Sequence, residues 1–330
     1  MGGHPRGRAG DRAPGRAMKI FVAGGTGVLG RSTVRSLVEA GHTVRATGRG
    51  EAKAAVVRAL GAEPVDADLY DPRSVRRAIT GSEAVLRLTT KIPPLMKMAR
   101  RGAWTETNKL RTVGARVLVD AAIFEQIPIY VHESVTFVYA DAGDLLIGED
   151  AQVDDGGTAV LRAALDGERE AARFSQSGRQ GIVLRFGAFY GPDAPSTLES
   201  VQLVKRRMLP LIGPGAHYVS SIYVSDAARA VAAALGLPAG VYNVCDDRPV
   251  LFAEYLDALA GAVGAPPPLR LPGMLGGSLF GDVWKYFSRS QRVSNARFKE
   301  ESGWSPAVKS VFEGWRLVAA ALPRPGAGGQ

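Results

Sequence analysis

A glycine-rich turn between a short apolar run and a helix-like stretch is the feature that most constrains this fold. Residues 19–30 read KIFVAGGTGVLG, and the apolar run at 20–23 lacks helical spacing, which is typical of a strand buried on both faces of a parallel sheet. After the glycines, Val34, Leu37 and Val38 share one helical face. A strand, a glycine turn and a helix in this order predict a pyrophosphate site, because the N–H groups at a helix start attract anions.

The composition is that of an ordinary globular protein rather than a membrane or disulfide-rich one. The chain has 330 residues, 46% of them hydrophobic and 22% charged, and it contains no apolar run long enough to span a bilayer. Its single cysteine, Cys245, excludes a disulfide framework and a cysteine metal site. We therefore expect a protein of the reducing cytoplasm, with no bound metal and no membrane contact.

The net charge of +9 raises the question of a nucleic-acid partner. Residues 1–17 carry four arginines against one aspartate and almost nothing apolar, which predicts a disordered basic leader and makes Met18 an alternative start. The remaining arginines are dispersed, and no basic stripe is interleaved with aromatic residues. We expect no nucleic-acid partner.

The residue that ends the second predicted strand, at 42–48, bears on the choice of cofactor. An acidic residue here would bind the ribose hydroxyls of NAD, whereas a basic residue accommodates the additional phosphate of NADP. This chain has Arg49 at that point and no carboxylate before Glu51. The pattern favours NADP over NAD, and a solvated loop arginine is the alternative.

Strand-like and helix-like segments alternate along the first two thirds of the chain. Helices are predicted at 51–60, 72–80, 105–123 and 159–177, and strands at 63–67, 84–90, 127–132 and 181–186. This alternation predicts an α/β fold, a Rossmann-type doubly wound parallel sheet over residues 18–190. Residues 191–330 are predicted to form mainly a smaller C-terminal substrate lobe, with a loop at 265–277, and the strand at 240–244 is expected to rejoin the sheet.

The chain from Met18 onward resembles the extended short-chain dehydrogenase/reductase superfamily, of the NAD(P)-dependent epimerase/dehydratase type. The resemblance is carried by GGTGVLG at 24–30, the Asp68-Leu69 pair, NKLRTVGARVLVDAA at 108–122, ESVTFVY at 133–139, LRFGAFYGP at 184–192 and IYVSDAARAV at 222–231. It implies cofactor contacts by the turn residues Gly24, Thr26, Gly27, Val28, Leu29 and Gly30, by Asp68 and Leu69 at the adenine, and by Thr89 near the ribose. It also implies a catalytic role for Ser134 and a homodimer formed through the helices at 105–123 and 159–177.

The chain departs from the family in its acid–base pair. Members carry a tyrosine four residues before a lysine, some two dozen positions after the serine. This chain has no tyrosine between Tyr139 and Tyr190 and no lysine between Lys109 and Lys205. Val160 stands near the expected position of the tyrosine, and neither it nor its neighbours in the predicted helix replace the pair.

Four residues near the predicted strand ends are candidates for the missing proton donor. Glu133 and Ser134 follow the strand at 127–132, Lys91 follows the strand at 84–90, and Tyr139 lies further along the chain. A positioned carboxylate, phenol or amine can each move a proton during hydride transfer. Each also has an ordinary alternative, as a cap for Glu133 and Ser134, as core for Tyr139 and as a surface charge for Lys91.

Three functional hypotheses follow from these observations. The first is an NADP-dependent oxidoreductase that acts on a small carbonyl or hydroxyl compound with a non-standard acid–base group. The second is an epimerase, dehydratase or cyclase that uses the bound cofactor transiently or structurally. The third is a non-catalytic NAD(P) sensor or partner-binding protein, which would explain the lost tyrosine and lysine. The aromatic segment at 273–287 either lines an apolar pocket or packs a small lobe.

Overall fold

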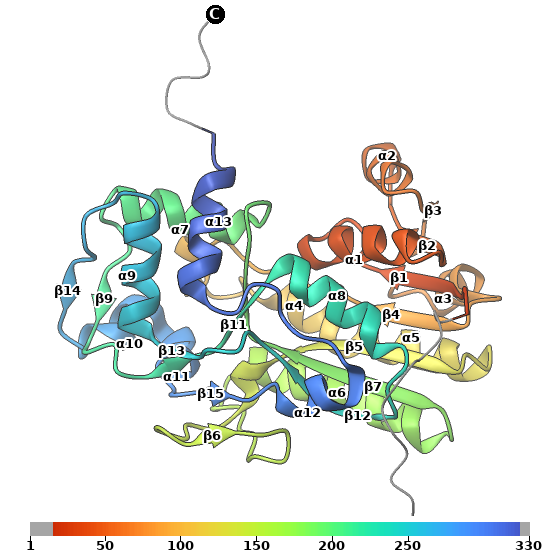
Figure 1. The fold of residues 1–330 in the computed structure, drawn as a ribbon. Helices are drawn as coiled ribbons and strands as arrows, with labels where there is room; N and C mark the ends of the chain where they lie inside the picture. Colours follow the sequence, from red (N-terminus) through yellow and green to blue (C-terminus); the bar gives the residue numbers. More distant parts are fainter. Residues whose placement is uncertain (1–15, 324–330) are drawn as a thin grey trace, which may run out of the picture.

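A seven-stranded parallel sheet forms the centre of the molecule (Figure 1). The computed structural model describes residues 16–323, so nearly all of the predicted leader lies outside the described residues. The strand order is β12-β7-β5-β4-β1-β2-β3. The strands are β1 (Lys19–Ala23), β2 (Thr43–Thr47), β3 (Glu63–Val65), β4 (Ala84–Arg87), β5 (Ile129–Val135), β7 (Gln180–Phe186) and β12 (Gly240–Val244). This order is that of the Rossmann-type doubly wound fold expected from the sequence.

The order of the strands reverses between β1 and its neighbour β4. The chain moves from β1 to β2 and β3 on one side, and from β4 to β5 and β7 on the other. In the parallel register, Val22 lies opposite Ala46 of β2 and Leu86 of β4. Ligands of doubly wound sheets bind outside the carboxyl ends of the strands at such a switch point, which here is the position of the glycine turn.

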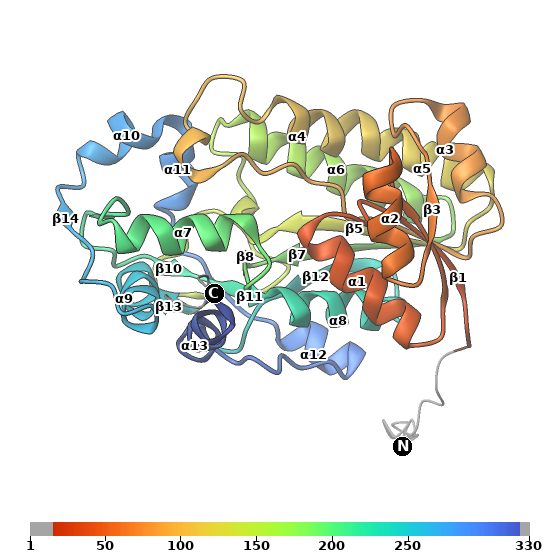
Figure 2. The same cartoon turned by 90° about the horizontal axis from the view of Figure 1, so that it is seen from above.

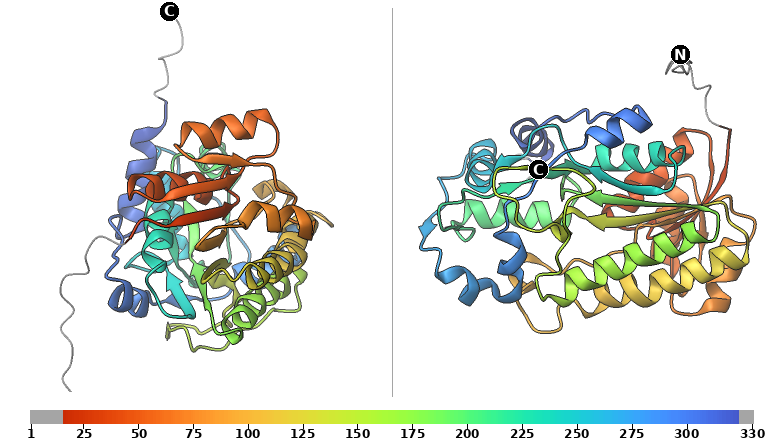
Figure 3. Two further views of the ribbon diagram at one scale, coloured as in Figure 1. Left: turned by 90° about the vertical axis from the view of Figure 1, so that its right-hand side faces the viewer. Right: turned by 90° about the horizontal axis from the view of Figure 1, so that it is seen from below.

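Helices cover both faces of the sheet (Figure 3). One face carries α1 (Val28–Glu39) and α8 (Val224–Ala234), and the other carries α3 (Pro72–Ile79), α5 (Ala115–Phe124) and α6 (Ala159–Gln176). The side chains of α1 that were predicted to share a face are Val34 and Leu37, both fully buried, with Val38 packed beside them. Because successive strand residues alternate, β1 sends Ile20 and Val22 into one layer and Phe21 into the other.

The structure modifies three predicted element boundaries. β4 ends at Arg87 rather than at residue 90, so Thr89 and Lys91 lie in the connection after it. β5 runs to Val135, since Val135 still pairs with Phe186 of β7, and Glu133 and Ser134 are therefore inside the strand rather than after it. The long helix predicted at 105–123 consists of α4 (Thr105–Lys109), a π-helical segment (Leu110–Gly114) and α5.

A smaller group of helices lies beyond the end of the sheet where β7 passes into β8 (Ala188–Tyr190) (Figure 2). Its core joins Tyr190, Leu259 and Trp315, and it includes α7 (Pro195–Lys205), α9 (Phe252–Ala262) and α13 (Val311–Ala321). The remaining elements are α2 (Glu51–Ala59), β6 (Leu146–Ile147), β9 (Leu211–Ile212), β10 (Tyr218–Val219), β11 (Ser221–Tyr223), β13 (Val250–Leu251), β14 (Arg270–Leu271), α10 (Leu275–Phe280), α11 (Trp284–Phe287), β15 (Arg292–Val293) and α12 (Ala296–Ser302).

The later part of the chain contributes to both regions. β12 pairs in parallel with β7 at the edge of the sheet, and α8 packs beside α1 on one face of it. Both elements come after residue 190, so part of the later chain belongs to the sheet domain. The segment at 265–277 is not wholly a loop, because β14 pairs with β9 and α10 begins at Leu275. Among residues 16–323, no helix combines the length and the apolar character needed to cross a membrane.

Candidate functional site

The glycine turn after β1 is held by tight backbone contacts. Gly24 has a φ of +99°, and a β carbon there would lie 2.6 Å from the Leu88 carbonyl oxygen. A β carbon on Gly30 would overlap the Gly24 carbonyl oxygen, so α1 can start this close to β1 only with glycine at that position. The Gly24 N–H donates to the Thr47 hydroxyl at 2.8 Å, which ties the turn to the end of β2.

The N-terminus of α1 is open to a ligand. Gly27 is the N-cap and offers no side chain to the helix, and its own position is exposed. The N–H groups of the first helical residues have no partner within the helix, and Val28, Leu29 and Gly30 occupy these positions. The Leu29 side chain is buried in the core, so its contribution to a ligand would come from the backbone. This cradle of N–H groups and glycines fits the pyrophosphate of a dinucleotide.

Arg49 lies at the same edge of the sheet as the glycine turn. It is two residues beyond Thr47, whose hydroxyl holds Gly24, and its side chain is exposed. Among residues 16–323, Arg49 has no carboxylate within ion-pair distance. An exposed guanidinium beside the turn is available to a phosphate group.

Four other residues were predicted to contact the cofactor: Thr26, which lies half-buried within the glycine turn, and Asp68, Leu69 and Thr89, which follow β3 and β4 at the same edge of the sheet. The Asp68 carboxylate accepts the Tyr70 N–H at 3.0 Å, and Leu69 is buried among the side chains of the second layer. A β carbon on Gly24 would lie 3.0 Å from the Thr89 methyl group, so Thr89 borders the turn directly. The Thr89 hydroxyl is buried and has no hydrogen-bond partner in the described chain.

Glu133 is joined to the connection that follows β4. Its two carboxylate oxygens accept the Thr90 hydroxyl at 3.0 and 2.8 Å, and the side chain is 5% exposed. Thr90 is the neighbour of Thr89, which borders the glycine turn. A carboxylate and a hydroxyl in contact at this edge can pass a proton between them.

Ser134 faces the opposite side of β5, because adjacent strand residues alternate. Its hydroxyl donates to Glu168 of α6 at 2.5 Å, and the Arg185 guanidinium of β7 donates to both oxygens of the same carboxylate at 2.9 and 2.6 Å. Burial alone would lower the pKa of Arg185, but the hydrogen bonds and charge of Glu168 raise it above its ordinary value. Ser134 thus donates its hydrogen bond to the buried ion pair between Glu168 and Arg185.

Tyr139 contacts the same ion pair as Ser134, whereas Lys91 does not. The Tyr139 hydroxyl donates to the Asn243 side chain at 2.8 Å, the ring lies 4.8 Å from the Arg185 guanidinium, and burial raises the pKa of its phenol. The Lys91 side chain is exposed, and its carbonyl oxygen accepts the Thr107 hydroxyl. Two of the four predicted proton donors, Ser134 and Tyr139, therefore surround the Arg185–Glu168 pair, while Glu133 and Lys91 do not.

Two groups at this site were not anticipated. Thr47 holds the glycine turn, and Arg111 of the π-helical segment is only 3% exposed. A signal for Arg111 was present in the sequence, since it lies four residues before Ala115 and seven before Leu118, both fully buried. This spacing places an arginine on the buried face of a helix.

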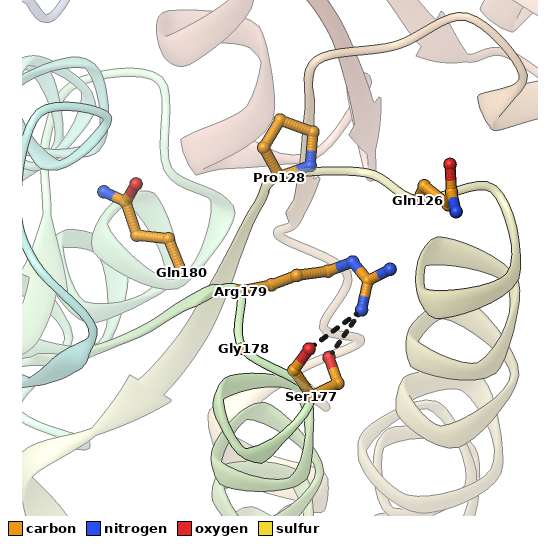
Figure 4. A pocket seen from close by; sticks show the side chains of 6 residues that line it. All are labelled: Gln126, Pro128, Ser177, Gly178, Arg179 and Gln180. Carbon is orange, nitrogen blue, oxygen red and sulfur yellow. Dashed lines mark hydrogen bonds between the residues drawn. The ribbon is translucent and has the colours of Figure 1, made fainter.

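The pocket drawn in Figure 4 lies elsewhere. It is at the amino ends of β5 and β7, away from the glycine turn, and its polar contacts are internal: Arg179 donates to the Ser177 carbonyl at 3.1 Å and to its hydroxyl at 2.9 Å. The lining residues are Gln126, Pro128, Ser177, Gly178, Arg179 and Gln180. This end of a parallel sheet is not where doubly wound folds bind ligands.

Comparison with known proteins agrees with this geometry. The profile of the NAD dependent epimerase/dehydratase family matches residues 20–245. A 3-diazoavenalumate denitrifying reductase of Streptomyces is 32% identical over 308 residues, covering 90% of this chain and 99% of the relative. A 2-alkyl-3-oxoalkanoate reductase of Stenotrophomonas maltophilia is 25% identical, covering 76% of this chain and 77% of the relative.

Solved structures share the fold at lower identity. The human epimerase family protein SDR39U1 with NADPH superposes with a TM-score of 0.75 at 19% identity, covering 92% of this chain and all of that chain (100%). The Thermus thermophilus UDP-glucose 4-epimerase complex with NAD has a TM-score of 0.73 at 22% identity, covering 92% and 98%. The chain therefore belongs to the NAD-dependent epimerase/dehydratase family of extended short-chain dehydrogenases/reductases, and it is an NAD(P)-dependent enzyme of that family.

Proposed function

We propose that this protein is an NADP-dependent reductase of a small carbonyl compound, working without the usual tyrosine–lysine pair. The observation that supports it most is the exposed Arg49 beside an open glycine turn, with no carboxylate bound to it in the described chain. A guanidinium at this position complements the additional phosphate of NADP. The acidic residue that would bind the ribose hydroxyls of NAD does not stand at this position.

Different residues of the chain would bind the cofactor and transfer the proton. The backbone N–H groups of Val28, Leu29 and Gly30 would hold the pyrophosphate, and Arg49 the additional phosphate. The bound cofactor supplies or accepts a hydride. Glu133 is the candidate we favour for the accompanying proton, since it is buried and bonded to Thr90, the neighbour of the Thr89 that borders the glycine turn.

Ser134, Tyr139 and Lys91 remain candidates with less support. A Ser134 hydroxyl committed to Glu168 and a Tyr139 hydroxyl committed to Asn243 would have to leave those bonds to reach a substrate. Turnover that survives Glu133→Gln and Lys91→Met but is lost in Tyr139→Phe would transfer the role to Tyr139.

Two relatives suggest the substrate class. One is named for 3-diazoavenalumate and another for 2-alkyl-3-oxoalkanoates, both of which are carboxylates with a group that hydride can reduce. An acceptor that takes a hydride without a simultaneous proton would suit a site that has lost the usual proton donor. An epimerase or dehydratase is the alternative; we also propose a cytoplasmic homodimer.

The test of the cofactor assignment is a fluorescence titration of the purified protein with NADPH and NADH. Arg49→Ala removes a charge-assisted hydrogen bond to phosphate, so we expect NADPH affinity to fall at least about tenfold and NADH affinity by less than about twofold. Arg316→Ala, an exposed arginine of α13, is the matched charge control and should change neither affinity. An equal loss for both cofactors in Arg49→Ala would remove the NADP assignment.

A second measurement separates the reductase from the epimerase or dehydratase. The NADPH absorbance band is followed against a panel of keto acids, simple ketones and aryl diazo acids. Consumption of NADPH on any of them supports a reductase, whereas tight NADPH binding with no consumption on the whole panel would contradict it. Isomerisation without net change in the band would favour an epimerase.

A further inference from the structure

Five charged side chains are buried near the carboxyl ends of β4, β5 and β7, and we name them the buried charge cluster: Arg87, Arg111, Arg185, Glu133 and Glu168. Arg87 and Glu133 come from neighbouring strands, and the Arg87 guanidinium donates to the Glu133 carbonyl oxygen at 3.2 Å. Three arginines and two glutamates leave a net charge of 3 − 2 = +1, since burial and the nearby arginines lower the pKa of His132 well below its usual value and keep it neutral.

Most members of the buried charge cluster have partners. Arg185 and Glu168 form an ion pair with two hydrogen bonds, at 2.9 and 2.6 Å. Arg87 donates to two backbone carbonyls, at 3.2 and 2.8 Å, and Glu133 accepts from Thr90. Within residues 16–323, neither Arg87 nor Arg111 has a carboxylate within ion-pair distance, and Arg111 has the fewer hydrogen bonds of the two.

Arg111 has little direct compensation for its burial. Its one hydrogen bond in the described chain is to the Val160 carbonyl oxygen at 3.3 Å, its Nε has no partner, and no carboxylate within residues 16–323 lies within 4.0 Å. Burial lowers the pKa of the guanidinium to about 10, although the more distant charges of Glu133 and Glu168 act to raise it. A buried cation with an unsatisfied Nε–H and no carboxylate in contact is costly to the ligand-free protein, which indicates a site completed by an anion.

A second unsatisfied donor lies in the neighbourhood of Arg111. Among residues 16–323 the buried Tyr286 hydroxyl of α11 has no hydrogen-bond partner, and the charge of Arg111 lowers the pKa of this hydroxyl against the larger rise caused by burial. Arg111 binds the carbonyl of Val160, and Val160 and Tyr286 belong to one apolar cluster. Both donors thus lie around Val160, which stands near the position at which the family places its catalytic tyrosine.

Aromatic and aliphatic side chains cover these donors. Two connections supply most of them, the one between β4 and α4 and the one that contains α10 and α11, which lie together at one end of the molecule (Figure 2), and the turn after β5 supplies Phe137. The Phe137 ring lies 6.0 Å from that of Tyr286 and 5.0 Å from that of Phe287. The members of this cover are Leu95, Met98, Trp104, Phe137, Phe280, Val283, Tyr286 and Phe287.

We propose that Arg111 and the Tyr286 hydroxyl bind the carboxylate of an aromatic substrate, whose ring replaces part of this cover. Both oxygens of a carboxylate can accept from the guanidinium fork, one of them can also accept from the phenol, and the negative charge neutralises the excess charge of the cluster. The aromatic rings around the donors favour a flat apolar body on the same ligand. The proposal rests on the proposed function, since it assigns the substrate class of that same site.

The test uses binding rather than turnover, with 4-hydroxycinnamate as probe and its neutral amide as matched ligand. The full-length protein is saturated with NADP⁺, and affinity is measured by titration calorimetry. Wild type should bind the carboxylate more tightly than the amide. Arg111→Met should weaken the carboxylate at least about tenfold and leave the amide unchanged, and Tyr286→Phe should weaken the carboxylate about threefold.

Thermal unfolding of the ligand-free proteins gives a second, independent measurement. Because Arg111 is buried without a carboxylate, Arg111→Met should raise the Tm, whereas Arg185→Met should lower it by leaving Glu168 buried without its partner. A fall in the Tm of Arg111→Met, or its failure to fold, would show that Arg111 is structural and would overturn the proposal.

The remaining outcomes separate this proposal from the proposed function. If a wild type that binds NADPH binds the carboxylate and the amide equally well, the carboxylate site is contradicted and the proposed reductase is not. Loss of NADPH affinity in Arg111→Met as large as the loss for the carboxylate would assign Arg111 to the cofactor instead. A wild type that binds the carboxylate but not NADPH would end the proposed function.

Discussion

At the scale of single residues, the glycine turn depends on which positions lack a β carbon. Gly30 and Gly27 both border the proposed pyrophosphate cradle, yet their surroundings differ. A β carbon on Gly30 would overlap the Gly24 carbonyl oxygen, whereas one on Gly27 would lie 3.3 Å from that oxygen with nothing else within 4 Å. Gly27 has an ordinary φ of −73°, so alanine there introduces no backbone strain.

These surroundings predict different results for two alanine substitutions. Gly30→Ala forces α1 away from β1, and we expect a loss of about 1–3 kcal/mol in the free energy of unfolding together with lost NADPH binding. Gly27→Ala, the matched control, should fold with a near-normal denaturation midpoint and lose affinity only. Chemical denaturation and NADPH titration of both variants check this. Equal stability of the two would contradict the close approach at Gly30.

At the scale of elements, the close packing of α6 against the sheet depends on one glycine of the helix, Gly167. A β carbon on Gly167 would lie 2.6 Å from the His132 Nε2 of β5 and 2.9 Å from the Arg111 carbonyl oxygen. Since His132 is fully buried, its ring has no room to withdraw. The absence of a side chain at 167 therefore brings α6, β5 and the π-helical segment together around the buried charge cluster.

Two helical glycines provide a matched comparison. Gly167→Ala overpacks the α6–β5 contact, and we expect it to destabilise the fold by about 1–3 kcal/mol. Gly261 in α9 has nothing within 4 Å of its would-be β carbon, so Gly261→Ala should stabilise by about 0.5–1 kcal/mol through helix propensity. Urea unfolding measures both changes. Stabilisation by Gly167→Ala would mean that α6 is not held this closely.

At the scale of the whole molecule, buried titratable groups make stability depend on pH. Burial, followed by the charges of Arg87 and Arg111, lowers the pKa of His132 well below its ordinary 6.5. Below pH 6.5 the unfolded chain binds a proton at this residue that the folded chain does not, so stability falls as pH falls. Asp246 opposes this trend, because burial raises its pKa in the folded state well above the unfolded value.

A difference measurement isolates the histidine from such opposing groups. Between pH 6.5 and pH 5, wild type should lose up to about 1.4 kcal/mol per pH unit more than His132→Gln, since the variant has no proton to bind there. His42→Gln is the control at a half-buried ring whose pKa is lowered by burial alone. Urea unfolding at several pH values gives both slopes. Parallel wild-type and His132→Gln slopes would contradict the buried neutral ring.

The sequence by itself determined the parts of the molecule that depend on local spacing. The apolar run, the glycines and the helical face of Val34 and Leu37 specify a strand, a turn and a helix within 23 residues (19–41), and the structure contains them there. The alternation of such units predicted the doubly wound parallel sheet, which the structure confirms. Backbone conformation and side-chain periodicity are set by residues close in the sequence, so one amino-acid sequence is enough to reveal them.

Only the tertiary structure decided which distant side chains meet. Ser134 is bound to Glu168, and Tyr139 to Asn243, over separations of 34 and 104 residues. Extending β5 to Val135 placed Glu133 and Ser134 on opposite faces, and Arg111 is buried with no carboxylate of residues 16–323 within ion-pair distance. Such pairings arise from the docking of completed elements, where register and burial choose partners among groups that no local spacing relates.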